Sequence, residues 1–309
     1  MEVGETVSLR VATATGATEI VGVVLSRTAE TLVVRRRDGR LADVPVASIT
    51  ASRVVPPGPA RRISATDLEL VAAAGWRALE TAALGDWLLR ASGGFTARAN
   101  SALAVGDPGM PLDEAVSTVE KWYADRSRPA RIQLVGDNPE LTQILSNRNW
   151  IDGGVDDVLT AEIAHVLRPL GNADSPLIRI DETPDPQWLA AYRTSDGPLP
   201  AVATEVLTNH PAVAFLSARG TAAGCDAIAR VAVDGRWAGL FAVEVAPRAR
   251  RQGLARAISA AALRWATGNG ARHAYLQVAA GNDAARALYE RLGFAVHHHY
   301  THWVASAGE

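Results

Sequence analysis

The sequence predicts two mixed α/β domains of one kind, preceded by a small all-β domain. Five short β-prone runs come first, strands then alternate with helices, and one strand–turn–helix pattern recurs 144 residues later. A length of 309 residues is enough for two ordinary domains and a small third. We expect the three domains to span residues 1–57, 62–168 and 172–309.

The first domain is expected to be an SH3-like or Tudor-like barrel. Its predicted strands are Thr6–Val11, Glu19–Ser26, Thr31–Arg37, Arg40–Pro45 and Ile49–Val54. Asp38-Gly39 predicts a two-residue hairpin turn, and Pro56-Pro57-Gly58-Pro59 predicts a stiff linker. The segment is mildly basic, but acidic residues interrupt its arginines and it has no aromatic residue. A solvated strand face is therefore favoured over a nucleic-acid patch.

The rest of the chain alternates between helix and strand patterns. The expected helices are Thr66–Ala74, Leu112–Asp125, Pro139–Asn147, Pro186–Arg193, Ala201–Asn209, a segment from Gly253 to Thr267, and Asn282–Leu292. The expected strands are Asp86–Arg90, Phe95–Val105, Arg131–Val135, Asp157–Ile163, Leu177–Ile180, Ala212–Ala218, Cys225–Val233, Trp237–Val245, His273–Ala279, Phe294–His299 and Tyr300–Ala305. A segment rich in Pro, Gly and Asp, residues 168–186, is expected to link the two α/β domains.

An internal repeat relates these two domains. Arg131–Trp150 and Tyr275–Phe294 align without a gap at an offset of 144 residues. The offset pairs two glutamines, two asparagines and two closing aromatics: Gln133 with Gln277, Asn138 with Asn282, and Trp150 with Phe294. We therefore predict two copies of one fold, the first copy over 62–168 and the second copy over 172–309.

The stretch VEVAPRARRQGLAR, residues 243–256, has the composition of an anion site. A β-prone run leads into an arginine-rich turn, and Gly253 then opens a helix. Free N–H groups and the positive end of the helix dipole favour a phosphate group at such a position. The alternative is a solvated arginine turn that starts an ordinary helix.

The repeat supplies an internal comparison for this turn. The 144-residue offset places Gly109 opposite Gly253, in the segment SALAVGDPGMP, residues 101–111. That segment has no arginine, carries Asp107, and has prolines where free N–H donors are needed. Leu145 stands opposite Tyr289. We expect the first copy to have kept the scaffold and lost the anion site.

Residues 172–300 resemble the GNAT (Gcn5-related) N-acetyltransferase family. The resemblance depends on three signatures in order: VEVAPRARRQGLA, the strand LQV, and the helix NDAARALYERLGF. The whole chain is similar to actinobacterial tandem GNAT proteins with a degenerate first copy and an N-terminal barrel. Such a chain is implied to be a cytoplasmic acetyl-CoA-dependent N-acetyltransferase with its active site in the second copy.

The resemblance also implies which residues bind the acetyl-CoA donor. Backbone groups of Val243 and Val245 pair with the pantetheine arm where the strand splays from its neighbour, Asn282 hydrogen-bonds that arm, and Ala285 leaves room for it. The pyrophosphate is implied to lie against Arg250, Arg251, Gln252, Gly253, Leu254, Ala255 and Arg256.

The implied reaction is direct attack of a neutral amine on the thioester. Tyr289 stands at the general-acid position, and its alternative role is packing under the sheet. Glu244 is the first candidate for the base or for anchoring a water, ahead of Glu205 and Asp226; its alternative role is a structural partner of an arginine. The first copy is expected to form one wall of the acceptor cleft.

Composition excludes some functions and leaves others open. The net charge of −2, a single cysteine (Cys225) and the lack of a long apolar run speak against nucleic-acid, disulfide and membrane classes. His297-His298-His299 does not favour a metal, because neighbouring side chains of a strand alternate faces. One of these histidines, or Tyr300, is instead a candidate to line the acceptor pocket. The acceptor, a small molecule or a protein, stays unassigned. A CoA-binding sensor without turnover and a histone-like protein acetyltransferase with the barrel as docking module remain the alternatives, and O-acylation or a longer acyl chain also stays open.

Overall fold

The structure is a computed structural model in which the chain divides into two compact units, residues 1–63 and 64–309. It describes residues 6–13, 16–36, 41–54, 63–170, 178–192, 198–219 and 224–306. The predicted hairpin turn Asp38-Gly39 and the proline linker at 56–59 lie outside the described residues. No helix in the described ranges is long and apolar enough to cross a membrane.

The first unit is an antiparallel sheet of five strands in the order β4-β3-β2-β1-β5. The strands are β1 (Thr6–Thr13), β2 (Gly16–Arg27), β3 (Thr31–Arg36), β4 (Leu41–Pro45) and β5 (Ile49–Val54), with a 3-10 turn η1 (Val46–Ser48) before β5. Alternate residues of β1 (Val7, Leu9 and Val11) are buried, so one face of the sheet carries the core. The predicted all-β segment is confirmed.

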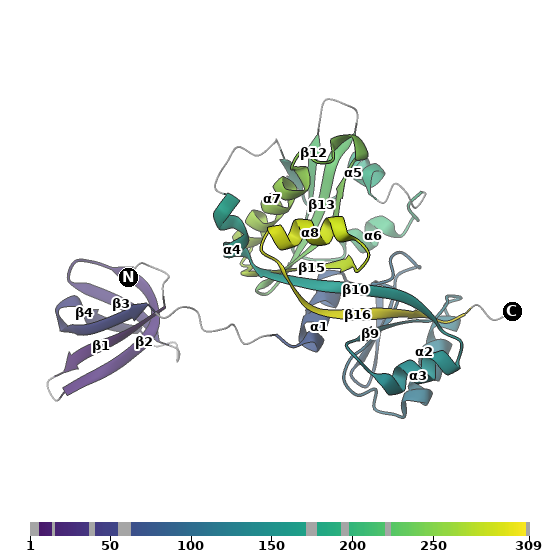
Figure 1. The fold of residues 1–309 in the computed structure, drawn as a ribbon, viewed down its shortest axis with the longest axis horizontal. Coiled ribbons are helices and arrows are strands. Elements are labelled where there is room, and N and C mark those ends of the chain that lie inside the picture. The colour runs from purple at the N-terminus through teal and green to yellow at the C-terminus, as the bar shows by residue number, and fades with distance from the viewer. Residues whose placement is uncertain are drawn as a thin grey trace. The chain divides into compact units, whose positions relative to one another are not determined.

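The second unit contains both copies in one sheet of eleven strands (Figure 1). The first copy supplies α1 (Ala65–Gly75), β6 (Glu80–Leu84), β7 (Trp87–Ala91), β8 (Ala102–Ala104), α2 (Leu112–Ala124), β9 (Arg131–Val135), α3 (Pro139–Asn147), β10 (Ile151–Glu162), α4 (Ile163–Leu167) and η2 (Arg168–Leu170). The second copy supplies β11 (Ile178–Asp181), α5 (Pro186–Ala191), α6 (Ala203–Thr208), β12 (Val213–Arg219), β13 (Cys225–Asp234), β14 (Trp237–Val245), η4 (Pro247–Ala249), α7 (Leu254–Gly268), β15 (His273–Ala279), α8 (Asp283–Arg291) and β16 (Ala295–Val304).

The repeated segment has the same local structure in both copies. Asn138 and Asn282 cap their helices, each accepting a hydrogen bond from the backbone N–H three residues on, at 3.0 and 3.1 Å. Each helix ends in a residue of positive φ, Asn149 at 58° and Gly293 at 93°. The closing aromatic then donates its backbone N–H to the residue five positions back, at 3.0 Å from Trp150 and 2.9 Å from Phe294.

The two copies exchange a strand. The sheet order is β11-β12-β13-β14-β15-β10-β16-β9-β8-β7-β6, so β10 of the first copy pairs with β15 of the second. In return, β16 of the second copy pairs with β9 of the first. The two registers are equivalent under the 144-residue offset. Asp156 pairs with Ala279, and its counterpart Tyr300 pairs with Val135, which is the counterpart of Ala279. A pseudo-twofold axis therefore passes between β10 and β16, which run side by side in Figure 1.

Both cores depend on the exchange. The core of the second copy includes Leu159, Ile163 and Val166, which belong to β10 and α4 of the first copy. The core of the first copy includes Trp303 of β16. Neither core is completed by side chains of its own copy alone.

A buried arginine that has no carboxylate partner among the described residues ties the first copy to the second. Arg230 on β13 donates to the carbonyl oxygens of Gly75 at 3.0 Å and Leu207 at 2.8 Å, near the ends of α1 and α6. Its guanidinium also lies 4.7 Å from the Trp76 ring centroid and 5.1 Å from that of Phe241. Burial lowers the pKa of Arg230 to about 10, which leaves it charged at neutral pH and attracted to the helix C-termini.

Two strand predictions are wrong. Phe95–Val105 is a strand only at β8, because Asn100 holds residues 92–100 as a loop: its side chain accepts from Ser92 N and Gly94 N and donates to two carbonyl oxygens of the loop. The segment predicted as two strands meeting at Tyr300 is the single strand β16, because it is paired on both sides, with β10 and with β9.

Trp303→Ala tests the exchange. The indole is 8% exposed and completes the core of the other copy, so its loss should destabilise the unit by about 3–5 kcal/mol. Thermal unfolding should show a lower midpoint and faster hydrogen exchange in β9 and α2. His299→Ala, an exposed position on the same strand, is the matched control. Unchanged protection of the first copy in Trp303→Ala would contradict the exchange.

Candidate active site

A cavity of about 450 Å³ opens where β14 and β15 separate. These parallel strands pair only at Trp237 with His273, Ala238 with Ala274 and Gly239 with Tyr275. Beyond this point both strands continue, and residues 240–244 of one and 276–279 of the other line the cavity. The unpaired backbone edges can hydrogen-bond an extended ligand laid between them.

A β-bulge in β14 accompanies the separation. Phe241 lies opposite Arg230 and Glu244 opposite Ile228, so Ala242 and Val243 together oppose one residue of β13. Ala242 has a φ of 51°, a conformation that an L-residue other than glycine adopts only under constraint. The bulge changes which side chains face the cavity at the position where the strands part.

The cavity brings together five of the residues predicted from sequence. Val243 and Glu244 come from β14, and Asn282, Ala285 and Tyr289 come from α8 and its cap. Val245 and Arg250 instead line a neighbouring cavity of about 680 Å³, together with Asp226. Glu244 lines both cavities and so lies between them. Arg251, Gln252, Gly253, Leu254, Ala255, Arg256 and Glu205 line neither.

Tyr289 is buried, with 5% of its surface exposed, and its ring lies edge-on to Phe294 at 5.6 Å. Burial raises the pKa of its phenol to about 12, with the Ser259 hydroxyl acting in the opposite direction. The phenol therefore keeps its proton at neutral pH and is able to donate it. The packing role foreseen as the alternative holds at the same time.

The arginine turn has the backbone of an anion site. Arg251 and Gly253 have φ angles of 64° and 80°, and Gly253 is the N-cap of α7. The N–H groups of the first helical turn have no partner within the helix. Arg250 donates to the carbonyl oxygen of Val245 at 3.3 Å, and Arg248 forms an ion pair with Asp226 at 2.7 Å. Asp226 therefore engages the charge of Arg248. The cations that remain for a ligand on either side of Gly253 are Arg250, Arg251 and Arg256.

The structure corrects the alignment of this turn with the first copy. Helices α2 and α7 start at Leu112 and Leu254, so Pro111 and not Gly109 is the counterpart of Gly253. The ungapped offset failed because α7, with 15 residues, is two residues longer than α2, with 13, and both helices lie between the turn and the repeated segment. The counterpart turn still has no arginine, and Asp107 accepts a hydrogen bond from Gly109 N at 2.8 Å, which engages a donor of the turn.

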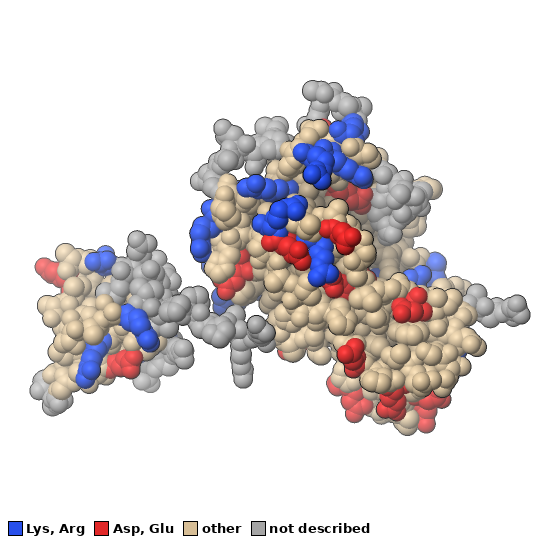
Figure 2. Space-filling model, in the orientation of Figure 1, with Lys and Arg blue, Asp and Glu red and all other residues tan. Residues whose placement is uncertain are grey.

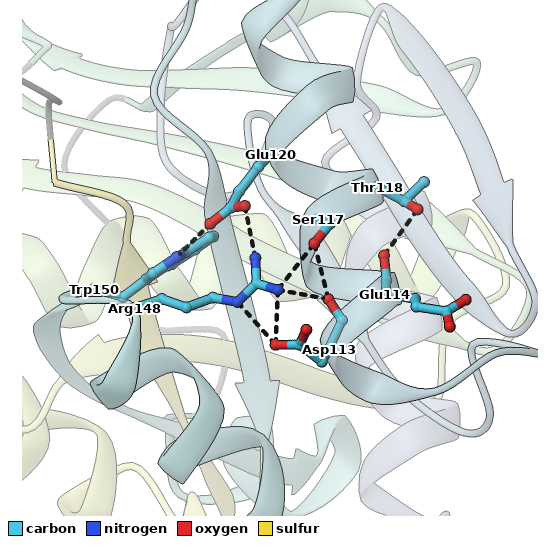
Figure 3. Close-up of polar contacts among 7 residues, drawn as sticks. All are labelled: Asp113, Glu114, Ser117, Thr118, Glu120, Arg148 and Trp150. Carbon is cyan, nitrogen blue, oxygen red and sulfur yellow. Dashed lines mark hydrogen bonds and ion pairs between the residues drawn. The ribbon is translucent and has the colours of Figure 1, made fainter.

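Acidic residues occupy the start of α2. Asp113 and Glu114 lie in its first turn, and Arg148 binds Asp113 and Glu120 at 2.7 and 2.8 Å (Figure 3). The first turn of α7 has no acidic residue. On the face drawn in Figure 2, Lys and Arg gather over α7 and both signs of charge alternate over α8, whereas Asp and Glu predominate over α2 and α3. The first copy is therefore unsuited to a pyrophosphate at the equivalent place.

The opposite wall of the cavity is formed by Arg98 of the 92–100 loop, Asp156 of β10, and Tyr300 and His302 of β16. The sequence predicted that the first copy forms one wall of the acceptor cleft and that Tyr300 is a candidate to line it, but it did not single out Arg98, Asp156 or His302. Asp156 lies 3.3 Å from His302 Nε2. Burial acts to raise the pKa of Asp156, but the His302 hydrogen bond and the charge of Arg98 outweigh it and lower that pKa. Only the strand exchange places these residues beside β14, so no local sequence signal could have found Arg98, Asp156 or His302.

The two repeated glutamines converge on one buried carboxylate. Glu69 of α1 is fully buried and accepts from Gln133 at 2.6 Å and from Gln277 at 3.4 Å. Because a carboxylate only accepts, the amide nitrogen of Gln277 faces Glu69, and its oxygen has no partner in the described chain. Glu69 also lies 3.1 Å from His298 Nε2, which gives the histidine run a structural contact.

Comparison with known proteins identifies the family. The sequence profile described as "Probable histone acetyltransferase Rv0428c C-terminal" matches residues 64–303, which is more than half of the chain. The chain belongs to this family. A relative, the probable histone acetyltransferase Rv0428c of Mycobacterium tuberculosis (strain ATCC 25618 / H37Rv), is 31% identical over 287 residues, 87% of this chain and 83% of that protein. The protein is an acyltransferase of the acetyltransferase class.

Solved structures confirm the predicted tandem GNAT fold. A GCN5-related N-acetyltransferase from Kribbella flavida matches with a TM-score of 0.60 and 22% identity, over 81% of this chain and 98% of its own. A tandem GNAT protein from the clavulanic acid biosynthesis pathway matches with a TM-score of 0.52 and 12% identity, over 82% and 92%. At these sequence identities, the two structures show only the fold of this GNAT protein.

Asn282→Ala and Asn138→Ala separate capping from ligand binding. Each variant removes an equivalent N-cap and should lower the free energy of unfolding by about 1 kcal/mol. Only Asn282 lines the cavity, so only its substitution should weaken CoA binding in a calorimetric titration, by roughly tenfold for one lost hydrogen bond. Equal CoA affinities of the two variants would leave Asn282 as a cap and nothing more.

Proposed function

We propose that the protein transfers an acetyl group from acetyl-CoA to a primary amine by direct attack, in the cavity between β14 and β15. The observation that carries this proposal is the separation of these strands after Gly239, with Val243, Glu244, Asn282 and Tyr289 meeting in the opening. Acetyl-CoA supplies the activated acetyl group as a thioester. The family assignment supports acetyl transfer as the class of reaction.

The residues present suit this donor. The free edge of β14 at Val243 can pair with the amide groups of a pantetheine arm, and Ala285 has no side chain beyond Cβ to obstruct it. The turn from Arg250 to Arg256 offers N–H donors and guanidinium groups for a pyrophosphate, each charge-assisted hydrogen bond contributing about 1.5–3 kcal/mol. The first copy lacks both features at its own turn. We therefore expect one CoA per chain.

Two side chains are assigned the proton transfers. Glu244 accepts a proton from the acceptor ammonium, directly or through a water, so that the nitrogen becomes nucleophilic. Tyr289 donates its phenolic proton to the sulfur as the carbon–sulfur bond breaks and the carbon–nitrogen bond forms. The nitrogen then loses its surplus proton to become an amide, and uptake of a proton returns Tyr289 to the phenol. A phenol whose pKa is raised to about 12 stays protonated and available for this donation throughout the neutral range.

CoA release over a panel of amines tests the proposal. Thiol release from acetyl-CoA should depend on the amine, and calorimetry should give a stoichiometry of one CoA per chain. Binding of CoA without amine-dependent release would favour a sensor, and two CoA molecules per chain would refute the asymmetry between the copies.

Tyr289→Phe should lower kcat by roughly 100-fold while changing the affinity for CoA little, since only the donated proton is lost. In the wild type, deprotonation of the Tyr289 phenol should not lower the rate until the pH approaches its pKa of about 12. Tyr123→Phe is the control, because its buried phenol donates to the carbonyl oxygen of Arg90 in the first copy. A kcat of Tyr289→Phe equal to that of the control would remove Tyr289 as the acid.

A protein acceptor is the second candidate, favoured by the name of the relative from Mycobacterium tuberculosis. In that case the first unit would serve as a docking module. Deleting residues 1–63 should then reduce acetylation of histone-like proteins and spare small amines. Equal losses on both substrate classes, or none, would speak against a docking role.

A further inference from the structure

Unpartnered buried polar atoms are concentrated in the active-site cavity. Four of the buried side-chain atoms that have no hydrogen-bond partner in the described chain line it: Arg98 Nε, Gln277 Oε1, Tyr300 OH and His302 Nδ1. Buried polar groups in proteins are normally hydrogen-bonded, so such a cluster indicates groups arranged for a ligand. The cluster lies on the wall formed by the exchanged strands and the 92–100 loop.

Arg98 is a cation that forms no ion pair with a described residue. No carboxylate oxygen of the described residues lies within 4.0 Å of its guanidinium. Asp156, which acts on Arg98 electrostatically, is engaged by His302 at 3.3 Å. Asn100 ties the loop that carries Arg98, and Trp76 donates to Thr96 of the same loop at 3.0 Å. The loop that carries the guanidinium is therefore held in place before any ligand arrives.

Tyr300 provides a second donor beside Arg98. Its side chain is fully buried, yet its hydroxyl makes no hydrogen bond within the described chain, although Arg98 and Asp156 both lie close to it. Arg98 and Tyr300 come from different copies and meet only through the strand exchange. A guanidinium and a hydroxyl that converge on one cavity suit an oxyanion, which accepts hydrogen bonds from both.

We propose that Arg98 and Tyr300 bind an anionic oxygen group of the acetyl acceptor, so that the substrate is a small amine carrying a carboxylate or a phosphate. This inference rests on the proposed transfer. The remaining lining agrees with it, because Glu244, on the wall opposite Arg98, carries the opposite charge and attracts the ammonium end of the same molecule. A cavity of about 450 Å³ limits the acceptor to a small molecule once the acetyl end of the donor is also present.

Matched substrates provide the test. The series consists of ω-amino carboxylates of two to six carbons, ω-aminoalkyl phosphates, and n-alkylamines of equal length. With acetyl-CoA and the full chain, the best anionic amine should exceed its matched alkylamine in kcat/KM by roughly 10- to 100-fold. The carboxylate and phosphate arms decide which oxyanion fits. No preference for either anion over the alkylamine would overturn the inference.

Two variants assign the preference to residues. Arg98→Gln removes the charge and should bring the ratio of kcat/KM between anionic and neutral amine close to one, whereas Tyr300→Phe should reduce that ratio in part. Arg236→Gln, at an exposed arginine outside the cavity, should keep the wild-type ratio. The ratio is compared only between variants whose thermal midpoints match. If Arg98→Gln does not fold, Tyr300→Phe alone decides, and an unchanged ratio there overturns the inference.

Binding without turnover separates this inference from the proposed function. The preferred anionic amine is titrated calorimetrically into CoA-saturated protein. Binding that Arg98→Gln abolishes, with no amine-dependent CoA release, would sustain the anion subsite and refute the transfer. Efficient transfer to alkylamines or to a basic peptide, with no effect of Arg98→Gln, would sustain the transfer and refute the subsite. If neither binding nor transfer occurs, both are refuted.

Discussion

The exchange of β10 and β16 is the constraint on which the second unit depends. Because β10 pairs with β15 and β16 pairs with β9, the sheet runs without a break through both copies. Each copy also lends apolar side chains to the core of the other, Leu159 and Ile163 in one direction and Trp303 in the reverse. The degenerate first copy therefore cannot be removed without opening the sheet of the second.

The active site follows from the same arrangement. Parallel pairing of β14 with β15 stops after three residues, and the bulge at Ala242 turns the strand where the cavity begins. On one side lie α8 and the turn that leads to α7. On the other lie Asp156 and Tyr300, the two residues related by the pseudo-twofold axis, together with Arg98. Symmetry of the scaffold thus brings two chemically different residues to one site.

The repeat and most elements could be predicted because they have local causes. The Asn138 and Asn282 caps, the apolar periodicity of α3 and α8, and the three GNAT signatures are all read within about twenty residues. The 92–100 loop could not, since its apolar and small residues resemble a strand and only the side-chain bonds of Asn100 hold it as a loop.

The candidate site was predictable in detail on one wall only. Val243, Glu244, Asn282 and Tyr289 belong to the signatures and do line the cavity. Arg98 and Tyr300 meet because β16 pairs with β10 and β9, at separations of 300 − 156 = 144 residues (Tyr300 with Asp156) and 300 − 135 = 165 residues (Tyr300 with Val135). The turn of the first copy was misaligned for a different reason, because a fixed offset cannot allow for the two additional residues of α7 relative to α2.

The exchanged strand also sets an order of events during synthesis. The first copy leaves the ribosome well before residues 295–304, yet β9 has no partner on one side until β16 is made. During that interval its apolar core stays open at the place that Trp303 will fill, and an unpaired strand edge of this kind is prone to wrong association. The nascent chain therefore has to remain soluble with half its sheet unfinished, and the acidic surface of α2 and α3 suits that requirement.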